Sequence, residues 1–283
     1  MHTKKTNIHA ITLIACILIF IDACDNTFEP FQENNQYVFS MYGTIDLHAD
    51  TQWVRVMPVG QTLLVEETEP MDATVELTRN STGQTVTMRD SLFQFATDAF
   101  AWNYWVPITL HPDEAYTVTA KNSDNEESKV IIQTPSVLPV PEVVEYFEDE
   151  DRGIITGSSK DSLVVLEVRY RVQNLLCGPE VEIVISFVNG IDHSQEDYRV
   201  NMSNAGRIAS RFGVLLGNYR VNSRKFVVVS VSEDWPDLAE YSDDEIVLPN
   251  VATNVENGTG FVPGIAKREI DITPPRERCY PSR

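Results

Sequence analysis

The feature that most constrains the fold is a short-range alternation of apolar and polar residues that recurs along the chain. It is clearest at 73–77 and 116–120, and again at 166–172 and 181–187. A period of two places the apolar side chains on one face of a β-strand, whereas a helix needs a period near 3.6. Residues 226–229 are apolar throughout, which is typical of a strand covered on both faces. The chain is therefore predicted to be mainly β.

Turn residues and prolines divide this pattern into parts. Short strands and a hairpin turn at 80–83 predict an immunoglobulin-like β-sandwich at 36–135. The proline-rich stretch 136–141 favours extended backbone and is predicted to be a linker. Residues 142–283 are predicted to form a second β-rich domain with a C-terminal tail. It holds at most one short helix, at Ser203–Gly217, where apolar residues have helical spacing.

The N-terminal segment 1–23 has the composition of a secretory signal peptide. Lys4 and Lys5 precede a largely apolar run, Ile8–Ile21, which has 14 residues. A helix needs about 20 apolar residues to cross a bilayer, so this run is too short for a permanent anchor. Residues 24–35 are polar and are predicted to be a tether.

Cys24 is the expected site of lipid attachment. It follows Ile21-Asp22-Ala23, which fits a lipoprotein signal except for the charge on Asp22. Acylation at Cys16, or secretion without lipid, are the alternatives; cleavage before Cys16 would leave an apolar N-terminus. The mature protein is therefore expected in the cell envelope, lipid-anchored, most simply at the outer membrane on its periplasmic or surface face.

The two remaining cysteines, Cys177 and Cys279, are interpreted as a disulfide, because an exported chain enters an oxidising compartment. Two free thiols are the alternative. Neither cysteine has a histidine or second cysteine at the spacing of a metal site, and no metal or other cofactor is predicted.

The charge balance excludes some partners. The formal net charge is −20, which disfavours nucleic acid and anionic lipid headgroups. Three acidic clusters, at 124–127, 148–151 and 243–245, offer oxygens to calcium but lack the spacing of a calcium loop. Solvated acidic loops are the preferred interpretation, and Ca²⁺ remains the alternative ligand.

Catalytic motifs are scarce, and the protein is not expected to be an enzyme. HExxH, GxSxG, SxxK and the phosphate-binding P-loop are absent. At strand spacing Asp46, His48 and Asp50 would share one face, but a polar solvent-facing strand gives the same pattern. A hydrolase that uses two carboxylates is the further alternative.

Aromatic residues concentrate at 93–105. Trp102, Tyr104 and Trp105 would form a platform for stacking sugar rings if they are exposed, and sandwich core if they are buried. Carbohydrate binding through these residues is the main alternative function.

One C-terminal motif carries a resemblance. The segment 254–264 reads Asn-Val-Glu-Asn-Gly-Thr-Gly-Phe-Val-Pro-Gly, with a turn-forming Asn-Gly pair. It resembles a motif of a family of bacterial envelope lipoproteins that carry a domain of unknown function. The strand ending at 42–45, the hairpin at 73–77 and the late Cys279 are similar too. The motif residues are Asn254, Asn257, Gly258, Gly260 and Phe261.

This resemblance implies an accessory protein beside an outer-membrane TonB-dependent uptake receptor, and it implies no catalytic residue. The first expectation is therefore a non-enzymatic, lipid-anchored binding or scaffolding protein of the envelope.

The lipid anchor gives a first prediction. Cells labelled with radioactive palmitate should incorporate label into the wild-type chain and into Cys16→Ala, but not into Cys24→Ala, since only Cys24 remains after cleavage. Label retained on Cys24→Ala would refute the assignment.

Overall fold

A computed structural model describes residues 37–59, 71–96, 99–147, 152–174, 179–188, 196–203, 219–233, 235–236 and 253–273. They are strands and the loops between them, and the expected mainly-β fold is confirmed. The strands are β1 (Phe39–Asp46), β2 (Gln52–Pro58), β3 (Thr74–Arg79), β4 (Gln84–Thr87), β5 (Arg89–Ala96), β6 (Ala99–Val106), β7 (Ala115–Lys121), β8 (Glu127–Gln133), β9 (Glu142–Phe147), β10 (Arg152–Ser158), β11 (Ser162–Asn174), β12 (Glu180–Ser186), β13 (Asp197–Ser203), β14 (Tyr219–Val231), β15 (Val255–Glu256), β16 (Gly258–Phe261) and β17 (Gly264–Asp271).

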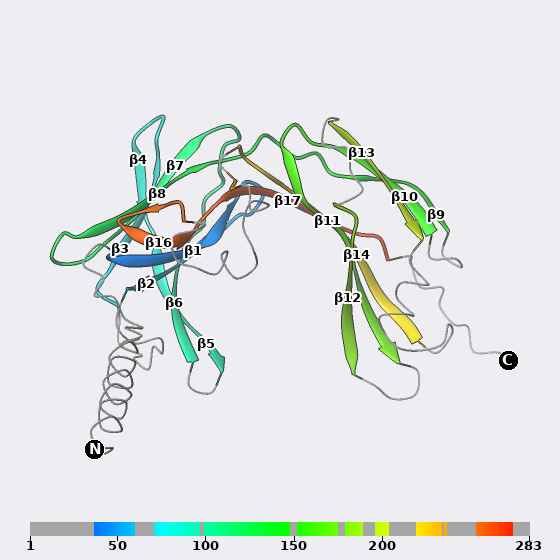
Figure 1. Cartoon of the computed structure of the whole chain (residues 1–283), viewed down its shortest axis with the longest axis horizontal. Helices are drawn as coiled ribbons and strands as arrows, with labels where there is room; N and C mark the ends of the chain where they lie inside the picture. Colours follow the sequence, from blue (N-terminus) through cyan, green and yellow to red (C-terminus); the bar gives the residue numbers. More distant parts are fainter. Residues whose placement is uncertain are drawn as a thin grey trace, which may run out of the picture. The chain divides into compact units, whose positions relative to one another are not determined.

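The N-terminal half forms a β-sandwich (Figure 1). One layer is the end of a long sheet in the order β17-β1-β2-β6-β5, and β16 also pairs with β1. The other layer is a five-stranded sheet in the order β15-β8-β7-β3-β4. Alternate residues of both layers, such as Met41 and Val118, are fully buried in one core. The period-two pattern thus identified the inward faces of these strands correctly.

The same long sheet continues as β14, β11 and β12, and a three-stranded sheet, β13-β10-β9, contributes to the same buried core. The middle of strand β14 is completely covered: Phe226, Val227 and Val228 are 0% exposed. Phe226 and Val228 face one hydrophobic cluster, and Val227 and Val229 face another. The prediction of a strand covered on both faces is confirmed, because only such a strand can bury consecutive apolar residues.

The C-terminal motif returns to the N-terminal sandwich. Strand β16 pairs in parallel with β1, so that Phe39 lies opposite Gly258 and Tyr42 opposite Phe261. Strand β15 pairs with β8 in the facing layer. Residues 142–283 therefore supply strands to the N-terminal sandwich as well as to the C-terminal half. The predicted domain division at 136–141 did not include this contribution.

Side-chain hydrogen bonds explain the asparagines of the motif. The Asn254 amide donates to the Val262 carbonyl and accepts from the Val262 N–H, both at 3.0 Å, as a neighbouring strand would do. Asn257 has a φ of 52° at the turn, and its carbonyl accepts from Val38 N–H at 3.0 Å and from the Ser128 hydroxyl at 2.6 Å. The motif is therefore a structural clasp over β1 and β8.

The glycines of the motif are required by crowding. A Cβ at Gly260 would overlap the Met41 carbonyl oxygen, and one at Gly258 would overlap the Phe39 carbonyl oxygen. Gly260 also has a φ of 109°, a conformation that L side chains rarely adopt. Only glycine allows β16 to approach β1 this closely.

The predicted linker has extended backbone but is anchored to its surroundings. Leu138 is 1% exposed, its N–H donates to His48 Nε2 at 3.3 Å, and its carbonyl accepts from Arg268 Nε at 2.9 Å. Ser136 N–H donates to the Asp161 carboxylate at 2.8 Å. These contacts connect the linker with loops and strands on either side of it.

Several predicted features lie outside the described residues. They are the signal peptide 1–23, Cys16, Cys24, the tether 24–35, the helix predicted at Ser203–Gly217 except for Ser203 (which ends β13), the Cys177–Cys279 disulfide and the acidic clusters at 148–151 and 243–245.

The clasp gives the second prediction. Gly260→Ala should lower the free energy of unfolding by about 3 kcal/mol or more, since it adds both a strained φ and a steric clash. Gly83 is the matched control: its φ is 70°, but a Cβ there meets nothing within 4 Å. Gly83→Ala should cost about 1 kcal/mol. If urea denaturation showed the same loss of unfolding free energy for Gly260→Ala and Gly83→Ala, the role of crowding would be contradicted.

Candidate functional site

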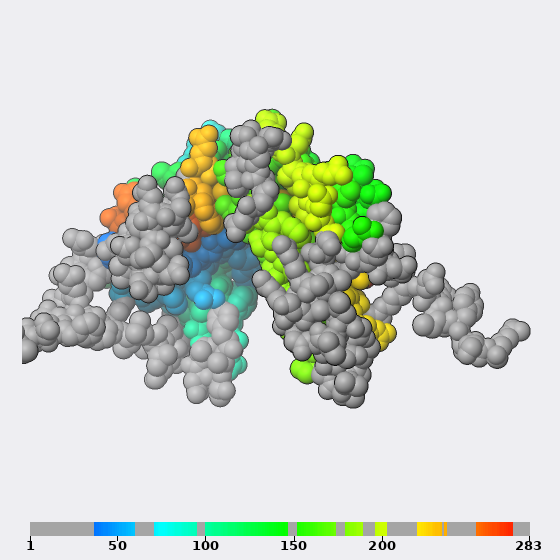
Figure 2. All heavy atoms as spheres, turned by 45° about the vertical axis from the view of Figure 1, so that its right-hand side comes forward, coloured from blue at the N-terminus to red at the C-terminus, as the bar shows by residue number. Residues whose placement is uncertain are grey.

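The outer face of β1, β2, β6 and β5 carries a row of exposed and half-buried side chains. Across these strands the register sets Thr44 opposite Trp53, Trp53 opposite Trp105, and Trp105 opposite Arg89. Directly opposed residues of neighbouring strands project from the same face of a sheet. In Figure 2 the blue strands β1 and β2 and the teal hairpin β5–β6 lie next to one another at the surface.

Trp53, Phe93 and Trp105 make ring contacts in this row, and they are called the aromatic face below. The Trp53 and Trp105 rings are stacked, with centroids 5.8 Å apart and planes at 27°. The Trp53 and Phe93 centroids are 5.4 Å apart. Trp53 and Phe93 each remain 39% exposed. Arg89 completes the row, because its guanidinium carbon lies 5.2 Å from the centre of the Trp105 ring.

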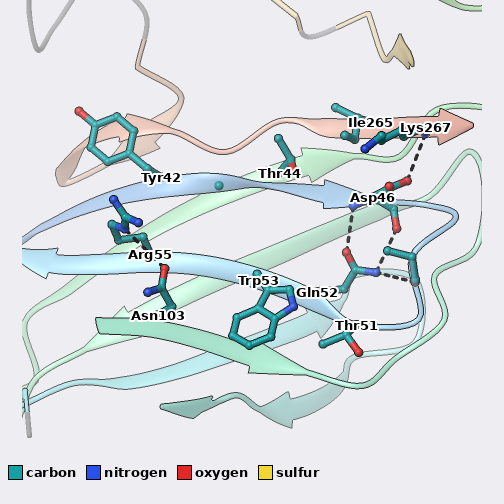
Figure 3. A pocket seen from close by; sticks show the side chains of 12 residues that line it. Tyr42, Thr44, Asp46, Thr51, Gln52, Trp53, Arg55, Asn103, Ile265 and Lys267 are labelled. Atoms are coloured by element: carbon teal, nitrogen blue, oxygen red, sulfur yellow. Dashed lines mark hydrogen bonds between the residues drawn. The ribbon is translucent and has the colours of Figure 1, made fainter. Parts of the chain in front are cut away.

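A pocket of about 440 Å³ adjoins the aromatic face (Figure 3). Trp53 belongs to both, and it contributes an apolar ring beside several polar side chains of the lining. The other pocket residues are Tyr42, Gly43, Thr44, Asp46, Ala49, Thr51, Gln52, Arg55, Asn103, Ile265 and Lys267. An apolar ring beside a few placed polar groups is the usual composition of a small-ligand site.

Hydrogen bonds fix one end of the pocket (Figure 3). The Gln52 amide accepts from Asp46 N–H at 2.9 Å, and donates to the Asp46 and Ala49 carbonyls at 3.0 Å each. One Asp46 carboxylate oxygen accepts from His48 N–H at 3.0 Å and from Lys267 N–H at 3.2 Å. Gln52 is 1% exposed, so this partly buried network is centred on a buried amide and holds the β1–β2 turn in place.

Arg55 and Asn103 form the other end. Arg55 Nε donates to the Asn103 side-chain oxygen at 3.4 Å, and the Asn103 amide donates to the Ala101 carbonyl at 3.2 Å. Asn103 is 7% exposed. The buried Asn103 side chain therefore fixes the orientation of the Arg55 guanidinium.

The predicted platform is corrected in part. Tyr104 is 3% exposed and Trp102 is half-buried against the core, since both point inward from β6. Burial also raises the pKa of Tyr104 to about 12. Trp105 projects from the opposite face, because successive residues of a strand alternate. Of the three predicted residues, only Trp105 joins the aromatic face.

The sequence analysis missed Trp53, although a local signal was present. Val54 and Val56 are both buried, so the alternation along β2 places Trp53 and Arg55 on the outer face. A tryptophan beside an arginine on the solvent side of a strand is the pattern that identifies this site.

The arrangement of Asp46, His48 and Asp50 on one strand face does not form, because β1 ends at Asp46 and a turn follows. His48 Nε2 accepts a hydrogen bond from the Leu138 N–H, and Asp50 is exposed on the turn. Burial, with a contribution from the nearby Arg268, lowers the pKa of His48 below its usual value. A neutral imidazole suits the acceptor position that His48 occupies.

The acidic cluster at 124–127 belongs to the turn between β7 and β8. Glu126 N–H donates to the Asn122 side chain, and the Asn122 amide donates to the Glu126 carboxylate, both at 2.9 Å. Within the described ranges, no group of three or more histidine, cysteine, aspartate or glutamate side chains is arranged to hold a metal ion. Among the same residues, no helix has the length and apolarity that crossing a bilayer requires.

Comparisons with known proteins find only distant structural likeness. The chain matches no known protein family and no curated protein. The fibronectin FN1–FN3 domains of chicken CNTN1 are similar with a TM-score of 0.27 and 13% identity, over 83% of this chain and 62% of that one. A pullulanase from Anoxybacillus sp. LM18-11 gives a TM-score of 0.22 and 7% identity, over 68% of this chain and 24% of that one. The chain thus spans only part of either protein.

Proposed function

We propose that this protein is a non-enzymatic, lipid-anchored envelope protein that binds carbohydrate on the aromatic face and in the adjoining pocket. The observation that carries the proposal is the stacked pair of the exposed Trp53 and the half-buried Trp105 beside polar pocket groups. The signal peptide, Cys24 and the resembling lipoprotein motif support an extracytoplasmic location.

The chemistry of sugars suits this surface. The C–H bonds on one side of a sugar ring are weakly positive and pack against the electron-rich face of an indole. The hydroxyl groups at the ring edge need hydrogen-bonding partners, which Thr44, Asn103 and Arg55 can supply from the pocket lining. Because the rings stand on paired strands, little conformational freedom is lost when a ligand binds.

The third prediction tests this function. Trp53→Ala and Trp105→Ala should weaken binding to whichever glycan the wild-type chain retains on an array by about 30-fold, which corresponds to about 2 kcal/mol per aromatic anchor. Calorimetric titration of the purified variants measures the loss.

Trp102→Phe is the matched control, since it changes an aromatic residue of the same strand that faces the core. It should leave the affinity within about twofold of wild type. Glycan binding that survives Trp53→Ala and Trp105→Ala unchanged, or binding to no glycan at all, would refute the proposed function.

A protein partner is the second candidate function, and one feature favours it. In the described sheet, β9 is an edge strand that pairs only with β10, and its Val144 is 57% exposed. Val137 and Val140, just before β9, are 55% and 61% exposed. Edge strands and exposed apolar residues are common sites of chain–chain contact. An accessory protein beside a TonB-dependent receptor could dock in this region.

The fourth prediction concerns that partner. Affinity capture from detergent-solubilised membranes of native cells should recover an outer-membrane receptor together with the wild-type chain. Val144→Lys should reduce the recovery severalfold, because a lysine on an edge strand opposes pairing with another chain. Thr156→Lys, on the neighbouring strand β10, is the control. Docking at β9 would be contradicted if the Val144→Lys chain recovered as much receptor as the Thr156→Lys chain.

A further inference from the structure

We infer that the sugar bound at Trp53 is acidic, a uronate- or sulfate-bearing glycan whose anionic groups lie against Arg55 and Lys267. This inference rests on the proposed carbohydrate function and specifies its ligand class.

The local charge differs in sign from that of the whole chain. The chain has 42 acidic and 22 basic residues, whereas the pocket lining holds Arg55 and Lys267 against a single acid, Asp46. Arg89 adds a third cation at the aromatic face through its position over Trp105. A cationic patch on a strongly acidic protein favours anionic ligands at that place.

The one pocket carboxylate already serves the backbone. An Asp46 oxygen accepts from the N–H groups of His48 and Lys267, at 3.0 and 3.2 Å. These two amide dipoles offset part of its negative charge. Asp46 therefore opposes an incoming anion less than an unbonded carboxylate would.

The acid next to Lys267 on β17, Glu269, is shared between two lysines. Lys225 Nζ donates to one Glu269 oxygen at 2.5 Å, while Lys267 Nζ lies 3.8 Å from the other. The hydrogen bond from Lys225 lowers the pKa of Glu269. Glu269 therefore interacts more closely with Lys225 than with Lys267. The Lys267 side chain is 38% exposed, so an anion can reach its ammonium group.

The spacing of the cations suits a chain of sugars. Along β1, Tyr42 lies opposite Arg55 and Thr44 lies opposite Trp53, while Asp46 pairs in parallel with Ile265, two residues before Lys267. Lys267 is therefore about six residues of strand, or about 20 Å along β1, from the level of Arg55. Trp53 therefore lies between the two cations, and Figure 3 shows Arg55 and Lys267 on either side of it. A ring stacked on Trp53 has a cation toward each neighbour in an oligomer.

Screening lets these local charges act despite the net charge. At about 0.15 M salt the Debye length is about 8 Å, so distant acidic residues are screened while contacts in the pocket are not. Affinity for an acidic sugar should consequently fall when salt rises from 0.15 to 0.5 M, and affinity for a neutral sugar should not.

Two pairs of probes test the inference by calorimetry on the full chain: oligogalacturonate with its methyl ester, and oligo-alginate with its propylene glycol ester. Each pair shares its sugar rings and differs in charge. We expect at least one acid form to bind about tenfold or more tightly than its ester. Arg55→Gln and Lys267→Gln should each weaken the acid form roughly fivefold and leave the ester within twofold.

Lys129→Gln is the matched control, because Lys129 is 36% exposed and lies in a surface ion pair with Glu256 on the other layer. It should change neither affinity. If no acid form binds more tightly than its ester, or if Lys267→Gln behaves like Lys129→Gln, the inference is overturned. Where both forms bind equally and Trp53→Ala weakens both, carbohydrate binding stands without the preference for acids. Where Trp53→Ala weakens neither, both proposals fail.

Discussion

Backbone pairing of β1 along both of its edges is the constraint on which the described structure depends. One edge pairs with β2, and the other pairs in parallel with β16 and then β17, more than 200 residues later in the chain. Ile45 N–H donates to the Pro263 carbonyl at 2.9 Å, and Leu47 N–H donates to the Ile265 carbonyl at 2.8 Å. Because β17 also pairs with β14, one continuous sheet passes through both halves.

The candidate site is a consequence of that sheet. Strand β2 is placed by β1, and the rings of Trp53 and Trp105 meet because β6 pairs with β2. Lys267 reaches the pocket only because β17 returns to β1. A surface built from three separate stretches of chain is held rigidly, so a ligand meets rings that are already in position. The pairing of the strands, rather than any single loop, therefore determines what this face can bind.

Local patterns predicted the strands, and long-range pairing limited what else could be predicted. The period of two found the buried faces of β3, β7 and β11, and the continuous apolar run found β14. The pattern could not give the register of β2 against β6, so Trp105 was grouped with its sequence neighbours Trp102 and Tyr104 instead of with Trp53. Likewise, the Asn-Gly turn at 257–258 was recognised as a turn, but not as part of a clasp on β1. Both errors arise because contacts between distant segments leave no mark on local periodicity.

The side-chain N–H signals of the four tryptophans provide the most direct test of the account. Trp53 and Trp105 lie on the aromatic face, Trp102 faces the core, and Trp235 packs edge-on against Phe261 with centroids 5.4 Å apart. In a nitrogen–proton correlation spectrum, addition of an oligosaccharide that the protein binds should shift the indole signals of Trp53 and Trp105 and leave those of Trp102 and Trp235 in place. Shifts confined to Trp102 or Trp235, or no indole shift at saturation, would contradict it.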